Sequence, residues 1–170
     1  RGLGDVYKRQ DKGARVVCMA HQGQPGEPEF TSLGKHAEHL SGLLGFRVEF
    51  ADDVFGPAAR NMIKNLRDGE VVLLDNVRMY SEEALERPAD VQSKTYLVRN
   101  LAPLGDVFIN DAFGTAHRSH ASTVGFTVVL PSGAGRLMEG EIRALNDVLR
   151  NPRKPLVFIL GGAKVKDSVR

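Results

Sequence analysis

The chain has a single cysteine, no long apolar run and almost no net charge, and each absence excludes a class of protein. Cys18, the one cysteine in 170 residues, lies inside an apolar run. This excludes a disulfide framework and indicates a buried thiol in a reducing compartment. No apolar run approaches the ~18 residues of a membrane span, and the sequence shows no secretory signal pattern. We therefore expect a cytoplasmic protein with no membrane partner.

The net charge of +2 comes from the N-terminal decamer. Residues 1–10 carry three cations and one anion, so 20 residues of each sign remain in the rest of the chain. Basic runs and interleaved aromatic residues, which mark single-strand binders, are missing, and we expect no nucleic-acid partner. The decamer also lacks the helical periodicity expected before a parallel strand. We interpret residues 1–10 as a non-native segment.

Short apolar runs that alternate with helical patterns predict an α/β protein with a mostly parallel sheet. The predicted strands are Val16–Met19, Arg47–Phe50, Glu70–Leu74, Asp106–Ile109 and Leu156–Leu160. A further apolar run lies at Val124–Val129.

Helices are predicted between these strands from apolar residues at helical spacing. Their expected starts are Thr31 or Ser32, Asp52 or Asp53, Asp90, and Gly135, with the last helix reaching Leu149 and burying an apolar stripe. Pro152 and Pro155 follow that helix and cannot continue it. We therefore expect one domain over residues 11–150, followed by a hinge and the start of a second domain over residues 151–170.

Four predicted strands end in cationic, polar or glycine-rich residues, and such ends meet at the ligand-binding edge of a parallel sheet. The ends carry His21; Asn76 and Arg78; Asn110, Asp111, His117, Arg118 and His120; and Gly161, Gly162 and Lys164. Cations and free backbone N–H groups at one edge predict a site for a small, multiply charged anion. Gly161–Lys164 is not a P-loop, because its spacing differs.

Other charged residues have simpler interpretations. His36 and His39 lie three positions apart on a predicted helix and lack a third ligand, so we expect no metal site. Glu82, Glu83 and Glu86 form an acidic segment that we interpret as a solvated face.

Four segments together resemble phosphoglycerate kinase, particularly its archaeal branch. They are Val16–Pro25 (VVCMAHQGQP), Leu73–Arg78 (LLDNVR), Asp106–Thr123 (DVFINDAFGTAHRSHAST) and Phe158–Lys164 (FILGGAK). The resemblance implies three-layer Rossmann-like domains joined by a hinge. It also implies reversible phosphoryl transfer between 1,3-bisphosphoglycerate and ADP, which gives 3-phosphoglycerate and ATP in glycolysis and gluconeogenesis.

The resemblance also implies roles for individual residues. His21, Gln22, Gly23, Gln24, Arg78 and Arg118 would hold phosphoglycerate. Lys164 would be the catalytic residue at the transferred phosphoryl group and would contact the nucleotide phosphates. Mg²⁺ would arrive with ATP or ADP at a site outside these residues, and a monomer is expected.

The sequence departs from the family pattern in three places. The opening Arg-x-Asp-x-Asn strand is missing, Gln24 occupies a position that is usually arginine, and Ser168 occupies one that is often lysine. We therefore expect an open sheet edge, and a polypeptide that is inactive without the nucleotide domain. A non-catalytic phospho-ligand binding module of the same fold is the alternative. Lys164 favours the kinase, and Gln24 favours the module.

Overall fold

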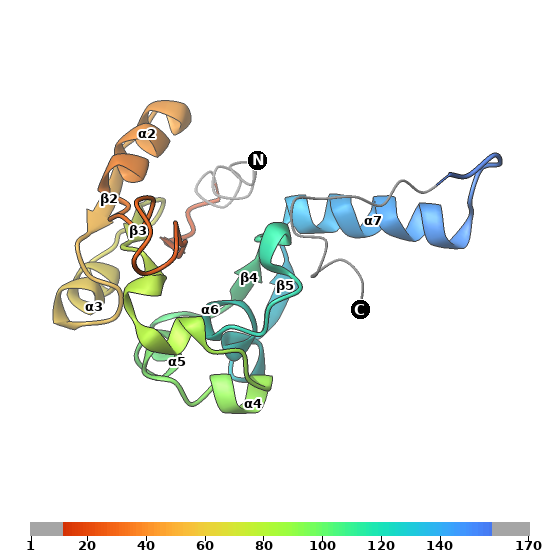
Figure 1. Cartoon of the computed structure of the whole chain (residues 1–170). Coiled ribbons are helices and arrows are strands. Elements are labelled where there is room, and N and C mark those ends of the chain that lie inside the picture. Colours follow the sequence, from red (N-terminus) through yellow and green to blue (C-terminus); the bar gives the residue numbers. More distant parts are fainter. Residues whose placement is uncertain (1–11, 158–170) are drawn as a thin grey trace. The chain divides into compact units, whose positions relative to one another are not determined.

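The computed structural model describes residues 12–157, and the chain divides into two compact units between Glu139 and Gly140. The first unit contains the five strands found among the described residues: β1 (Val16–Cys18), β2 (Val48–Ala51), β3 (Val71–Leu74), β4 (Phe108–Asn110) and β5 (Ser132–Ala134). Every strand pairing is parallel. The predicted parallel α/β fold is therefore confirmed, and Figure 1 shows its elements. The predicted strand at Leu156–Leu160 and residues 1–10 lie largely or wholly outside the described residues.

The larger sheet has the strand order β1-β3-β2. Its central strand, β3, is completely buried, and its side chains alternate between two apolar clusters. Val71 and Leu73 pack with α2 (Gly34–Leu44), whereas Val72 and Leu74 pack with residues of α3 (Pro57–Lys64) and α5 (Tyr96–Leu101). Since successive strand residues face opposite sides, helices cover both faces and give three layers.

Two helix starts differ from the expected caps. Neither Thr31 nor Ser32 is the N-cap of α2; Leu33 takes that position, and its N–H donates to the Asp75 carboxylate at 2.8 Å. Helix α3 begins at Pro57 with Gly56 as its N-cap, later than Asp52 or Asp53, although the Asp53 carboxylate accepts the N–H groups of Gly56 and Ala59.

The helix expected to start at Asp90 is interrupted. Its first part, α4 (Ala89–Gln92), begins after Pro88 rather than at Asp90, and Thr95 is extended before α5 begins. At the end of α4, the buried side chain of Gln92 donates to the carbonyl oxygens of Leu85 and Ser119 at 2.6 Å. These contacts link this part of the chain to a distant loop.

The apolar run at Val124–Val129 forms helical turns, at the end of α6 (Ala121–Val124) and in the 3-10 helix η5 (Gly125–Val128). The following strand, β5, pairs with β4 but was not predicted. Its three residues, Ser132, Gly133 and Ala134, are all exposed and carry no apolar pattern.

A groove of about 1130 Å³ lies between β1 and β4 in the first unit. Its walls include Val16–His21 and Asp106–Ala112, and its apolar lining includes Leu66, Leu101 and Phe126. Within residues 12–157, β1 pairs only with β3, and β4 pairs only with β5. Neither strand therefore has a second partner among the described residues on the side of this groove, and the expected open edge stays a prediction.

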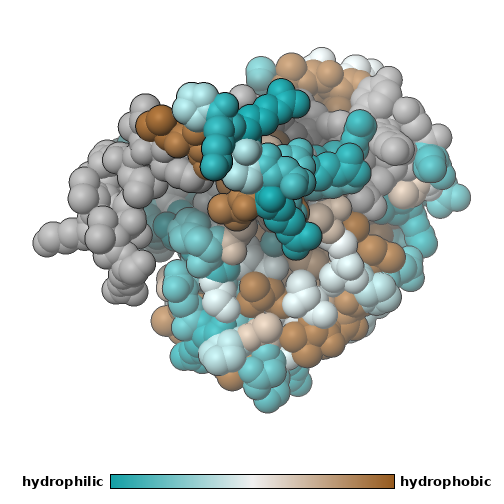
Figure 2. Space-filling model, turned by 90° about the vertical axis from the view of Figure 1, so that its right-hand side faces the viewer, coloured by the Kyte–Doolittle hydropathy of each residue, from teal (hydrophilic) through white to brown (hydrophobic). Residues whose placement is uncertain are grey.

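Helix α7 (Arg136–Arg150) matches the predicted longest helix, but its apolar stripe is not buried as expected. Ile142, Leu145 and Leu149 are 43, 50 and 71% exposed. Figure 2 shows apolar side chains exposed among polar ones on one face of the chain. No helix in the described part of the chain is long and apolar enough to span a bilayer.

Candidate functional site

The loop after β1 is fixed to the end of β3 by the side chain of Asn76. This amide donates to the carbonyl oxygens of Gln22 and Thr31 at 2.8 and 3.0 Å. The Gln22 side chain donates to Thr31 Oγ1 at 3.2 Å, and the backbone N–H of Gln24 donates to the Glu27 carboxylate at 3.1 Å. These bonds hold His21, which follows β1, beside the end of the neighbouring strand.

The side chain of Arg78, after β3, also contacts the loop that follows β1. Its side chain is buried, and its guanidinium donates to the carbonyl oxygen of Gly23 at 2.6 Å. Gly23 has φ +65°, and a Cβ atom there would lie 2.4 Å from the backbone nitrogen of Phe30. Only glycine fits such a conformation with backbone packed against it. The predicted residues Gln22, Gly23 and Arg78 thus meet in one turn.

The loop after β4 is closed by α6. At the start of this helix the Thr123 hydroxyl accepts the N–H of His120 at 3.1 Å, and it also donates to the carbonyl oxygen of Arg118 at 2.9 Å. The Arg118 side chain is half-buried, and its Nε lies 3.3 Å from His117 Nε2. Asp111 accepts the N–H of Met138 at 2.9 Å and leaves its other, buried oxygen without a hydrogen bond.

Four cationic or titratable side chains from three strand ends lie within electrostatic range of one another; we call His21, Arg78, Arg118 and His120 the cationic site. Burial, together with the charges of Arg78, Arg118 and His120, lowers the pKa of His21 to about 4. Burial and Arg118 also lower the pKa of His120. The two histidines are therefore disposed to be neutral until an anion offsets the two arginines.

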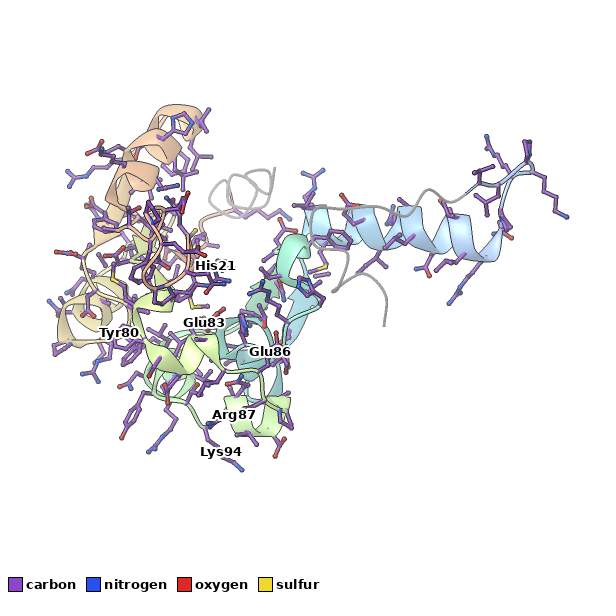
Figure 3. The ribbon with its side chains drawn as sticks, viewed as in Figure 1. His21, Tyr80, Glu83, Glu86, Arg87 and Lys94 are labelled. Carbon is purple, nitrogen blue, oxygen red and sulfur yellow. The ribbon has the colours of Figure 1, made fainter. Side chains whose placement is uncertain are left out.

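Glu83 was not recognised from the sequence, which indicated a solvated acidic face. That interpretation is wrong for this residue: Glu83 lies in the 3-10 helix η2 (Ser81–Ala84), and only 1% of it is exposed. Its carboxylate accepts the N–H of Ser122 at 2.9 Å and also the Ser122 hydroxyl. Figure 3 labels Glu83 together with His21 and Glu86. No local pattern distinguishes it from Glu82, because its burial depends on a residue 39 positions away.

The cationic site can bind a small anion with more than one charge. Two guanidinium groups supply paired N–H donors suited to carboxylate and phosphate oxygens, and their partial burial strengthens that attraction. The described residues hold no cluster of three or more His, Cys, Asp or Glu side chains placed for a metal ion. Lys164, the predicted phosphoryl-transfer residue, and Gly161 and Gly162 lie outside the described residues.

Comparisons with known proteins agree with this architecture. A family model described as phosphoglycerate kinase matches residues 3–170. The phosphoglycerate kinase of Methanothermobacter thermautotrophicus is 55% identical over 164 residues, which cover 96% of this chain and 40% of the relative. That of Methanopyrus kandleri is 49% identical over 170 residues, which cover all of this chain and 42% of the relative.

The solved structures that match this chain are also phosphoglycerate kinases. The crystal structure of phosphoglycerate kinase from Pyrococcus horikoshii OT3 matches with a TM-score of 0.93 and 42% identity, over 98% of this chain and 41% of that one. The structure of phosphoglycerate kinase from Coxiella burnetii matches with a TM-score of 0.76 and 35% identity, over 98% of this chain and 40% of that one. The chain thus spans about 40% of the length of these proteins.

Proposed function

Because the chain belongs to the phosphoglycerate kinase family, we propose that it supplies the phosphoglycerate-binding part of an enzyme with that activity. The proposed reaction is reversible phosphoryl transfer between 1,3-bisphosphoglycerate and ADP, which gives 3-phosphoglycerate and ATP. The resemblance inferred from four motifs is confirmed by the family model, and the archaeal relatives match the predicted branch.

The observation that carries this proposal is the convergence of His21, Arg78 and Arg118 from the ends of β1, β3 and β4. Arg78 and Arg118 lie 57 and 97 residues from His21 in the sequence, yet the charges of both act on it. A ligand with a carboxylate at one end and a phosphate at the other can engage both arginines. 3-Phosphoglycerate has this form.

The described residues would act by binding and positioning. Phosphoryl transfer requires mainly alignment of the reacting groups and stabilisation of charge on the transferred group. Arg78 is suited to the first task because the turn at Gly23 holds its guanidinium in place. Arg118 lies on a loop whose backbone is held by the Thr123 hydroxyl, which donates to the Arg118 carbonyl oxygen.

The nucleotide is proposed to bind elsewhere in the longer protein, with Lys164 directed at the transferred phosphoryl group. Residues 12–157 include no carboxylate cluster suited to Mg²⁺. This is compatible with Mg²⁺ arriving as the complex with ATP or ADP. The remaining length of the relatives, about 60% of each, leaves room for a nucleotide domain.

A binding module that lacks kinase activity is the second candidate, and Gln24 favours it, because an arginine there would add a cation. The two are separated by Lys164→Ala in the whole protein, measured with 3-phosphoglycerate, Mg-ATP and a coupled assay. The kinase proposal expects kcat to fall by at least about 100-fold with a smaller change in 3-phosphoglycerate affinity. It also expects residues 1–170 alone to give no turnover.

Three results would count against the kinase proposal. A whole protein that binds 3-phosphoglycerate but gives no turnover supports the binding module. A Lys164→Ala variant with weakened 3-phosphoglycerate affinity and normal kcat places the lysine with the wrong substrate. Turnover by residues 1–170 above a no-protein control contradicts the proposed division of labour.

A further inference from the structure

Glu83 is the buried carboxylate beside the cationic site, and the contacts described so far leave part of its position unexplained. Its two oxygens accept hydrogen bonds from the N–H and the hydroxyl of Ser122. Those bonds anchor the first turn of α6, and the residue immediately before that helix is His120. A buried negative charge calls for cationic partners; Arg78 is one within electrostatic range, and a second can be identified.

His120 offers that partner. Its side chain is 5% exposed, and its buried Nδ1 has no hydrogen bond, although it lies 3.7 Å from Glu83 Oε1. On the other side of the ring, Nε2 lies 3.8 Å from Oε1 of Glu86, whose side chain is 61% exposed. The imidazole thus lies between two carboxylates, both slightly too distant for a hydrogen bond. A shift of less than 1 Å would close either contact.

The charges around the ring decide when such a shift becomes favourable. Arg118, Arg78 and His117 all disfavour a second positive charge on His120, and Glu86 favours it. His21, at the end of β1, also lies within range of His120. The Glu83 carboxyl has its pKa raised by burial, while Ser122 and Arg78 act against that increase. An anion bound to the two arginines would remove most of the repulsion felt by the ring.

We propose that Glu83 is a positioning residue, which holds the first turn of α6 through Ser122 and receives a hydrogen bond from the His120 imidazolium when an anion occupies the cationic site. Closing this contact fixes His120 and the adjoining loop that carries Arg118. The buried Glu83 provides a strong partner in a low-dielectric setting, whereas the exposed Glu86 is screened by salt. The inference rests on the proposed function only in naming 3-phosphoglycerate as the anion.

The test is the protonation state of His120, read from its ring ¹⁵N chemical shifts at pH 7 in the 170-residue chain. Two probes are used, 3-phosphoglycerate and inorganic phosphate. In the unsubstituted chain the ring is expected to be neutral without ligand and protonated at saturation. In Glu83→Gln, which keeps an acceptor for Ser122, the ring should stay neutral at saturation and affinity should fall about tenfold.

Matched variants separate positioning from a purely structural role. Glu82→Gln changes the neighbouring carboxylate, which accepts the N–H of Tyr96 instead, and should leave both readouts unchanged. Ser122→Ala should lower the melting temperature, yet the ring should still become protonated on binding. Glu86→Gln should have a smaller effect than Glu83→Gln, and 0.5 M salt should remove it.

Each outcome decides the inference. A ring that stays neutral in the saturated, unsubstituted chain overturns it, as does a ring that protonates equally in Glu83→Gln. If phosphate binds and 3-phosphoglycerate does not, the proposed substrate is rejected while the phosphate data still test Glu83. If neither anion binds, both the proposed function and this inference are rejected.

Discussion

The guanidinium of Arg78 donates a 2.6 Å hydrogen bond to the carbonyl oxygen of Gly23, 55 residues away in the sequence. This bond joins the end of β3 to the turn after β1. It holds a buried cation next to His21 and so creates one side of the cationic site. The bond depends on the shape of the Gly23 turn, and that dependence leads to the first prediction.

Gly23→Ala should destabilise the chain by about 1–3 kcal/mol, because the new Cβ meets backbone atoms in a left-handed conformation. Its nearest contact would be the Phe30 nitrogen, at 2.4 Å. Gly26→Ala is the matched control, since Gly26 also has positive φ but has no atom within 4 Å of the added Cβ. Urea unfolding measures both. Equal losses in the two variants would show that the packing of the Gly23 turn is not important.

Stability should depend on pH through His21. Its pKa is about 4 in the folded chain and 6.5 ordinarily, so the unfolded chain binds more protons between these values. This contribution to stability is fully present above pH 6.5 and is lost as the pH falls toward 4. Urea midpoints at pH 7 and pH 4.5 should therefore differ less in His21→Gln than in the unsubstituted chain.

His36→Gln provides the control for that experiment, because His36 is exposed on α2. It should keep the full difference between the two pH values. If His21→Gln also keeps the full difference, the burial and charges around His21 do not act as described.

The edges of β1 and β4 that lack a partner within residues 12–157 should promote self-association of the 170-residue chain, since unpaired strand edges are templates for pairing. Val17 lies in β1 and is 36% exposed. Val17→Lys should shift association to higher concentration in sedimentation velocity. Leu43→Lys replaces an apolar residue of α2 that is 58% exposed, and should have a smaller effect. A Leu43→Lys effect as large as that of Val17→Lys would assign the association to general surface hydrophobicity instead.

Much of the fold follows from local patterns. The buried strand β3 and the longest helix were predicted to within a few residues, because a continuous apolar run marks the strand and apolar residues at helical spacing mark the helix. The contacts of Gln92 with Leu85 and Ser119, at the interruption between α4 and α5, could not be predicted. Likewise, the start of α2 is held by Asp75, 42 residues from Leu33.

Some residues of the candidate site were predictable from the sequence and others were not. His21, Arg78 and Arg118 follow strands, and this position alone placed them at one edge of a sheet. Glu83 and Glu82 are adjacent and chemically identical, so only the tertiary contact with Ser122 reveals that one of them is buried. The predicted roles of Gln24 and Lys164 stay predictions.

The most direct test of the account is the affinity of the chain for 3-phosphoglycerate, measured by calorimetry with Arg118→Ala. Loss of a charge-assisted hydrogen bond should weaken binding by about 1.5–3 kcal/mol. Arg47→Ala removes an exposed arginine that is paired with Glu49 at 2.8 Å just before β2, at the opposite edge of the sheet, and should leave affinity unchanged. An unchanged dissociation constant in Arg118→Ala, or an equal loss in both variants, would contradict a phosphoglycerate site at these strand ends.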